Sequence, residues 1–83
     1  MNLEWRCIYT GAGWADTQEL VDPTDLMSCF GTIVRQDRGK GKYWYCLTVW
    51  QPGVHLPDYT ATFTSRKKAQ AMGIVMARMF LAN

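Results

Sequence analysis

The chain has 83 residues, of which 48% are hydrophobic and 19% are charged, and its formal net charge is +2. The hydrophobic share excludes an intrinsically disordered chain, and the length fits one domain with a modest core. The sequence pI of about 8.5 is below the level that marks a dedicated nucleic-acid-binding domain.

The small net charge conceals two oppositely charged parts. Residues 1–30 contain five acids and one base, a net charge of −4, and residues 31–83 contain eight bases and two acids, a net charge of +6. We treat residues 1–83 as a single domain with an acidic part and a basic part. Such asymmetry indicates an electrostatic partner, either inside the molecule or outside it.

The acidic part is predicted to contain a strand and an irregular or short-helical segment. Apolar and polar side chains alternate over residues 3–10, which is typical of a strand, and the glycines of residues 11–13 end it. Asp22 followed by Pro23 is typical of a helix N-cap and first turn. We therefore expect a short helix over about residues 23–29.

The basic part is predicted to contain three strands and a helix, separated by a glycine turn and a proline-flanked loop. In chain order these are a strand at 31–36, a turn at 38–41, a strand at 42–51, a loop at 52–57, a strand at 59–64 and a helix at 66–81 that Ser65 caps. The predicted fold is α+β, with a three- to four-stranded antiparallel sheet and one C-terminal helix packed on one face.

The period of two along a strand predicts which side chains face the helix. We expect the helix over Tyr43, Tyr45, Leu47, Val49, Tyr59, Ala61 and Phe63. Gly73 interrupts the apolar face of this helix, and a close approach to the sheet would compensate for its poor helix propensity. The opposite face holds Trp44, Cys46, Thr48 and Trp50 and is too apolar to stay bare. Either the N-terminal segment covers it or a partner does.

Catalysis, metal binding and cofactor binding have little support in the sequence. Cys7, Cys29 and Cys46 are widely spaced, and His55 is the only histidine, so we expect reduced thiols, no metal and no cofactor. A general base needs a partner side chain that positions it, and the residue spacing indicates none, so we expect no enzymatic activity. The longest apolar stretch, residues 69–82, is too short to span a bilayer, and we predict a cytoplasmic location without membrane contact.

Two basic clusters are candidate partner-binding sites. Bases at a helix N-terminus form an anion site, and bases interleaved with aromatic residues suit nucleic acid, whose unpaired bases stack on rings. The alternative for both clusters is an ordinary solvated surface. The residues concerned are Arg66, Lys67 and Lys68 at the helix entry, and Arg35, Arg38, Lys40 and Lys42 around the glycine turn.

An acidic row and two tryptophans complete the candidate partner-binding set. Asp16, Glu19, Asp22 and Asp25 recur every three residues. They could dock on a basic partner or imitate a row of phosphates, or they could serve as solvated and capping carboxylates. Tryptophan is enriched at binding hot spots, so the set also includes Trp44 and Trp50, although core filling is the alternative for tryptophans.

Residues 31–82 resemble the small three-stranded DNA-binding domains at the N-termini of phage integrases. The matching residues are Gly31 and Ile33, then residues 42–45 (Lys-Tyr-Trp-Tyr), then Phe63, Ser65 and Ala69. This resemblance implies a DNA-binding unit of three strands and a helix. The acidic, Trp-containing N-terminal segment departs from that pattern.

The chain is also similar in style to phage accessory proteins of anti-CRISPR type, which are short, freestanding, Trp-rich α+β proteins. This similarity implies an inhibitor that docks on a host protein or nucleoprotein complex, such as a CRISPR effector, in the bacterial cytoplasm. One alternative is a nucleic-acid-binding module that uses the basic hairpin and the helix N-terminus. Another is an oligomerising subunit, because Ile74 and Leu81 are expected on the outer helix face, where they could support a homodimer.

Overall fold

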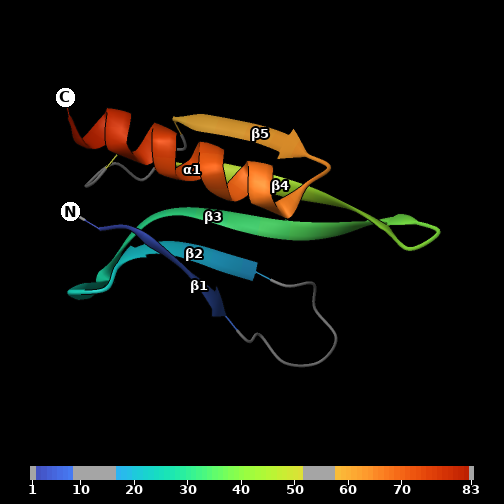
Figure 1. The fold of residues 1–83 in the computed structure, drawn as a ribbon, viewed down its shortest axis with the longest axis horizontal. Helices are drawn as coiled ribbons and strands as arrows, with labels where there is room; N and C mark the ends of the chain where they lie inside the picture. Colours follow the sequence, from blue (N-terminus) through green and yellow to red (C-terminus); the bar gives the residue numbers. More distant parts are fainter. Residues whose placement is uncertain (1, 9–16, 52–57, 83) are drawn as a thin grey trace.

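The computed structural model describes residues 2–8, 17–51 and 58–82, which form an antiparallel sheet and a helix packed against it (Figure 1). The elements are β1 (Glu4–Ile8), β2 (Thr17–Asp22), β3 (Asp25–Gly39), β4 (Lys42–Val49), β5 (Tyr59–Phe63) and α1 (Arg66–Leu81). The strand order is β1-β2-β3-β4-β5, so each strand pairs with its neighbours in the chain. The α+β class is confirmed, and the sheet has five strands rather than three or four.

The prediction of a short helix over residues 23–29 is wrong, because the chain makes a tight turn after Asp22 and enters β3 at Asp25. The Asp22 carboxylate accepts hydrogen bonds from the backbone N–H of Thr24 at 2.9 Å and from its hydroxyl at 2.7 Å. An aspartate before a proline is suited to start either a helix or a turn, since both use its side chain as an acceptor. Pairing of residues 25–34 with β2 decides for the turn.

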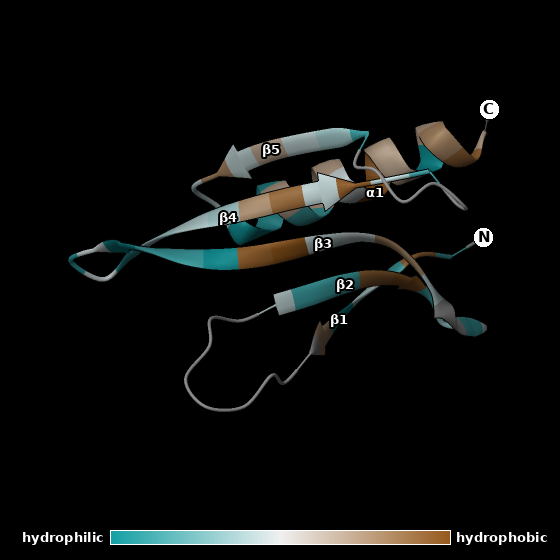
Figure 2. Cartoon of the chain, turned by 180° about the vertical axis from the view of Figure 1, so that it is seen from behind, coloured by the Kyte–Doolittle hydropathy of each residue, from teal (hydrophilic) through white to brown (hydrophobic). Residues whose placement is uncertain are grey.

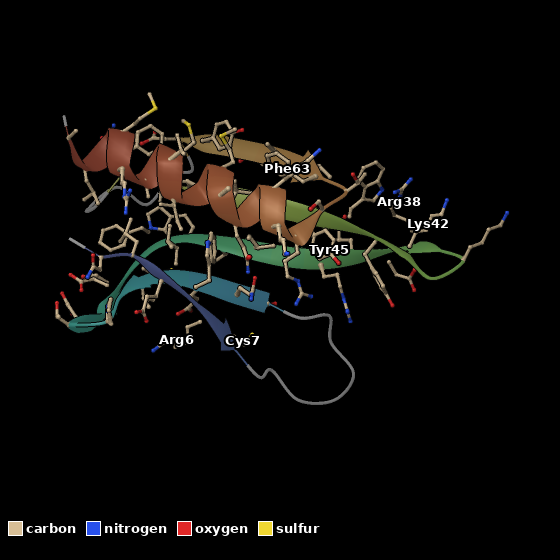
Figure 3. The ribbon with its side chains drawn as sticks, in the orientation of Figure 1. Arg6, Cys7, Arg38, Lys42, Tyr45 and Phe63 are labelled. Carbon is tan, nitrogen blue, oxygen red and sulfur yellow. The ribbon has the colours of Figure 1, made fainter. Side chains whose placement is uncertain are left out.

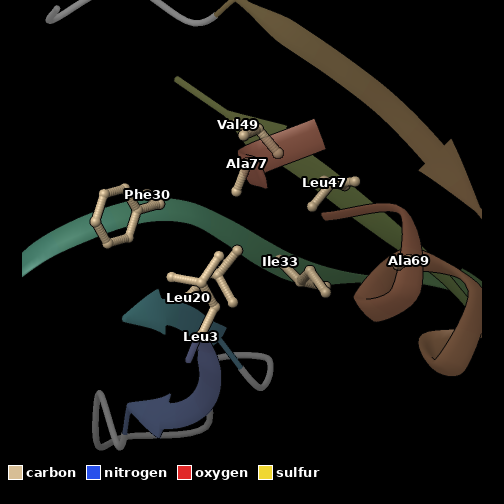
Figure 4. Close-up of a cluster of buried hydrophobic side chains, with 8 residues drawn as sticks. All are labelled: Leu3, Leu20, Phe30, Ile33, Leu47, Val49, Ala69 and Ala77. Atoms are coloured by element: carbon tan, nitrogen blue, oxygen red, sulfur yellow. The ribbon is translucent and has the colours of Figure 1, made fainter. Parts of the chain in front are cut away.

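The side of the sheet that faces α1 holds the hydrophobic core (Figure 4). Ile33 lies opposite Leu47 in the register of β3 and β4, and both are almost fully buried. The buried cluster consists of Leu3, Leu20, Phe30, Ile33, Leu47, Val49, Ala69 and Ala77. Tyr45, Tyr59 and Phe63 pack against it, so the predicted facing of β4 and β5 toward the helix is confirmed.

Helix α1 begins and ends where the sequence predicts. The Ser65 side chain accepts a hydrogen bond from the backbone N–H of Lys68 at 3.4 Å, which caps the first turn. The expected close approach at Gly73 is also confirmed. A Cβ built on Gly73 would lie 2.5 Å from Cζ2 of Trp5 and 3.0 Å from Cδ1 of Leu47. The indole N–H of Trp5 donates to the Gln70 carbonyl at 3.1 Å, so β1 is held against the helix.

The described parts of the N-terminal segment, β1 and β2, extend the sheet and do not cover its outer face. Strands β1 and β2 add to the edge of β3, where backbone groups gain hydrogen-bond partners. Leu20 and Val21 are buried as a result. Trp14 lies outside the described residues. Within residues 2–8, 17–51 and 58–82, no helix is both long and apolar enough to cross a membrane.

Candidate binding surface

The β3–β4 hairpin projects beyond the rest of the sheet as a two-stranded ribbon (Figure 1). Toward the tip of the hairpin, the pairing of β3 with β2 ends at Val34, and the pairing of β4 with β5 ends at Tyr45. Residues 35–44, which we call the arm, therefore lie outside the pairing with β2 and β5. The arm contains four bases and one acid. Its end is strongly hydrophilic, in contrast to the hydrophobic middle of both strands (Figure 2).

The tip of the arm is a turn with three consecutive positive φ angles, which confirms the predicted glycine turn. The φ values are 85° for Gly39, 57° for Lys40 and 74° for Gly41. The glycines adopt this left-handed region without steric cost. The Asp37 carboxylate accepts a hydrogen bond from the Gly39 N–H at 2.7 Å and steadies the turn. The only acid of the arm is thus engaged locally, and Lys40 is exposed at the tip.

Each face of the arm carries an arginine stacked on an aromatic ring. On the face away from α1, Cζ of Arg38 lies 3.9 Å from the centroid of the Trp44 ring. On the face toward α1, Cζ of Arg35 lies 4.3 Å from the centroid of the Tyr43 ring. Such cation–π contacts contribute about 0.5–1 kcal/mol at exposed sites. They hold each guanidinium in a defined place along the ribbon.

The helix entry and the base of the arm meet at Tyr45. The sequence was interpreted as having two separate basic clusters, and the fold brings them together at this residue. Cζ of Arg66 lies 5.4 Å from the centroid of the Tyr45 ring. Tyr45 is also the cross-strand partner of Arg35. Lys67 and Lys68 are exposed in the first turn of α1. Figure 3 shows Tyr45 and Phe63 near the base of the arm, with Arg38 and Lys42 toward its end.

Sequence reasoning missed Tyr45 as the residue that joins these clusters, although a signal existed. The period of two places Tyr45 on the helix side of β4, and the helix starts three residues after Phe63. Phe63 is the cross-strand neighbour of Tyr45. The register between β4 and β5 was needed to place the helix entry beside this ring, and the sequence does not supply that register.

The acidic residues divide between two places. Glu19 forms a salt bridge of 2.9 Å with Arg6 on the outer face of the sheet. Asp22 and Asp25 lie at the β2–β3 turn, at the end of the molecule opposite the arm (Figure 1). Asp16 lies outside the described residues. The predicted row is therefore split, and its described members take part in local contacts.

Hydrogen bonds set the ionisation of the turn acid Asp22. The side-chain hydrogen bond from Thr24, helped by the Thr24 backbone N–H, lowers the pKa of Asp22. Asp25 also has a local partner, because its carboxylate accepts a hydrogen bond from the Ser28 hydroxyl at 2.8 Å. The lowered pKa of Asp22 favours its ionised form.

No described segment covers the outer face of the sheet. Val34 and Trp44 are exposed there by 38% and 37%. Trp50 is half-buried, and its backbone N–H donates to the Phe30 carbonyl at 3.1 Å. Of the two tryptophans predicted to bind a partner, Trp44 is therefore the more accessible. Thr60 and Thr62 are exposed on the neighbouring strand.

The helix residues expected to support a homodimer are not on the outer face. Ile74 and Leu81 pack against the hydrophobic core, because α1 contacts β3, β4 and β5 and so buries a broad arc of its surface. Val75 and Met79 are the exposed apolar residues instead, at 52% and 55%.

The cysteines differ in environment, and none belongs to a metal-ligand cluster within the described ranges. Burial raises the pKa of the Cys29 thiol, which donates a hydrogen bond to the Gly31 carbonyl at 3.3 Å. Cys7 is exposed and accepts a hydrogen bond from the Gln18 amide at 3.6 Å. His55 lies outside the described residues.

Comparison with protein-family models, curated proteins and solved structures finds no match to this chain. The geometry and the charge of the arm are therefore the basis for proposing a function.

Proposed function

We propose that this chain is a non-catalytic binding protein whose contact surface is the arm. The supporting observation is that Arg35, Arg38 and Arg66 each lie over an aromatic ring at or beside the arm. The exposed guanidinium of Arg38 is held on Trp44 before binding, so it loses less side-chain entropy when it meets a carboxylate or phosphate. Lys40 and Lys42 add positive charge at the exposed tip. An anionic partner fits this surface.

The leading form of this proposal is a phage-encoded inhibitor of anti-CRISPR type that docks on a host defence nucleoprotein complex. A nucleoprotein surface presents phosphates beside basic side chains. The chain carries charge of both signs at the two ends of its 41 Å long axis, with the arm at one end and the Asp22–Asp25 turn at the other. Simultaneous contact of both ends would favour a composite surface over a purely basic or purely acidic one.

The test combines size-exclusion chromatography with a target-cleavage assay on a panel of purified CRISPR effector complexes. We expect co-elution and inhibition with at least one complex, and weaker binding for Lys42→Glu because it places a negative charge on the arm. Arg78→Glu is the matched control, since Arg78 is an exposed base near the other end of α1. Absence of co-elution and of inhibition across the panel would refute the inhibitor proposal.

The alternative is a nucleic-acid-binding module that uses both the arm and the helix N-terminus. The stacking of Arg66 on Tyr45 favours it, since this contact joins Lys67 and Lys68 to the arm as one basic surface. This alternative predicts affinity for DNA or RNA that falls steeply with salt. Lys67→Glu combined with Lys68→Glu should abolish that affinity in fluorescence anisotropy. No binding at low salt would remove this alternative.

A structural or oligomerising subunit is the third possibility, and the exposed Val75 and Met79 on α1 favour it. Association through this helix face predicts a sedimentation coefficient that rises with protein concentration and a loss of that rise in Met79→Glu. A monomer at all concentrations would count against a homodimer.

A further inference from the structure

We propose that the arm reads the major groove of double-stranded DNA, with Gln36 and Arg38 toward the base edges and Lys40 and Lys42 toward the phosphates. This inference rests on the proposed function, because it takes the arm as the contact surface and names the partner of that surface.

The dimensions of the arm match the major groove. Two paired strands lie about 4.8 Å apart, and the four residue steps from Arg35 to Gly39 span roughly 13 Å. The major groove of B-DNA is about 12 Å wide and about 8.5 Å deep, and it admits a two-stranded ribbon. Strands β2 and β5 stop pairing at the base of the arm, so neither widens the ribbon beyond Tyr45. The arm is therefore narrow enough to lie in the groove with its outer face toward the floor, and long enough to extend along the groove.

The outer face of the arm carries side chains suited to base edges. Gln36 is exposed and lies directly opposite Trp44 in the register of β3 and β4. Arg38 is two residues further along the same face and is stacked on that ring. The amide of glutamine pairs with adenine through two hydrogen bonds, and the guanidinium of arginine pairs with guanine in the same way. These neighbouring side chains could read adjacent base pairs.

The aromatic rings of the arm favour a duplex over a single strand. Unpaired bases bind by stacking on exposed ring faces. Here Tyr43 and Trp44 in the arm, and Tyr45 at its base, each have an arginine over one face, so these rings position guanidinium groups. Stacking of these rings on unpaired bases stays a prediction. Duplex RNA fits less well, because its major groove is deep and too narrow for side chains to read.

The charge distribution on the arm is compatible with this orientation. Lys40 at the tip and Lys42 beside it are exposed and have the reach to contact phosphates on the walls of the groove. The only acid, Asp37, alternates to the other face of the ribbon and binds the Gly39 N–H. This geometry turns Asp37 away from the groups that the outer face would contact.

The first experiment measures fluorescence anisotropy of the whole chain with labelled duplex DNA, single-stranded DNA and duplex RNA of the same sequence. We expect the tightest binding to duplex DNA. Two phosphate contacts, from Lys40 and Lys42, predict that log K falls against log salt with a slope of about −2. Selection from a randomised duplex pool should enrich an adenine next to a guanine. Equal or tighter binding to single-stranded DNA or to duplex RNA would overturn the inference, as would absence of duplex binding.

The second experiment uses arm variants whose folding is checked by circular dichroism. Arg38→Ala should weaken binding to the selected duplex by about tenfold or more and remove the preference for guanine, and Gln36→Ala should remove the preference for adenine. Trp44 acts as a positioning residue. Trp44→Phe, which keeps a ring under Arg38, should preserve the guanine preference, whereas Trp44→Leu should lose it. Unchanged base preferences in Arg38→Ala would overturn the proposal.

A matched control separates the arm from the helix entry. Lys67→Gln with Lys68→Gln removes two charges on the α1 side, and it should weaken duplex binding much less than Lys40→Gln with Lys42→Gln. Equal losses would overturn the assignment of the arm. If Lys42→Glu abolishes co-elution with an effector complex while the wild-type chain binds no duplex DNA, this inference fails and the proposed function stands.

Discussion

Replacing Gly73 with alanine tests how closely α1 approaches the sheet. Alanine has a helix propensity about 1 kcal/mol better than that of glycine, so the change would stabilise an exposed helix. At Gly73, however, the new Cβ would lie 2.5 Å from Cζ2 of Trp5, closer than van der Waals contact permits. The indole cannot move away without weakening its 3.1 Å hydrogen bond to the Gln70 carbonyl.

The expected result is a net loss of stability. Overpacking costs about 1–3 kcal/mol, and the hydrogen bond contributes about 1 kcal/mol. After the propensity gain is subtracted, Gly73→Ala should lower the free energy of unfolding by about 1–3 kcal/mol. For a domain of this size the midpoint of thermal unfolding should fall by about 5–20 °C. Urea and thermal unfolding, followed by far-UV circular dichroism, measure both quantities.

Two controls isolate the contact with Trp5. Ala71→Gly, on the exposed side of the same helix, should cost about 1 kcal/mol through propensity. In a Trp5→Leu background the 2.5 Å contact with the indole is removed and the 3.0 Å contact with Cδ1 of Leu47 remains, so Gly73→Ala should become close to neutral. The resulting coupling energy of about 2 kcal/mol is within reach of a double-mutant cycle. If Gly73→Ala has the same effect on the wild-type chain as on the Trp5→Leu chain, the reasoning is refuted.

Three further predictions concern local features. Gly31→Ala should destabilise the fold by about 1–3 kcal/mol in urea unfolding, because its Cβ would lie 2.8 Å from the backbone oxygen of Thr48; an unchanged midpoint would contradict this. Ser65→Ala should cost about 1 kcal/mol through loss of the N-cap, and Ser65→Asp should restore most of it. At pH 8, iodoacetamide should label the exposed Cys7 before Cys29, because burial raises the pKa of the Cys29 thiol; mass spectrometry would show the order, and equal labelling rates would contradict it. Because folding raises the pKa of Cys29, the contribution of this thiol to stability is present below the unfolded thiol pKa and is lost as the pH rises through the folded value.

Features that depend on neighbouring residues could be predicted from the sequence. Ser65 is followed by a run of helix-forming residues, and the helix over residues 66–81 was predicted with the correct bounds. Alternation along β4 correctly placed Leu47 and Val49 under this helix. The glycines around Lys40 correctly indicated the turn.

The errors occurred where one local signal is compatible with two structures. Asp22 begins a turn instead of a helix, because the following residues gain backbone hydrogen bonds by pairing with β2. Ile74 and Leu81 face the core because the helix rests on three strands. Helical periodicity shows which residues share a face, but it does not show how broad the buried arc is.

The sequence by itself determined the α+β class, the C-terminal helix with its cap and the charge asymmetry between residues 1–30 and 31–83. These follow from propensity, periodicity and composition, which act within a few residues. Only the tertiary structure decided that β1 and β2 extend the sheet, and that Arg66 meets the arm at Tyr45. Those outcomes depend on which strand edges find backbone partners and on the register between distant strands, and both are set by the packing of the whole chain.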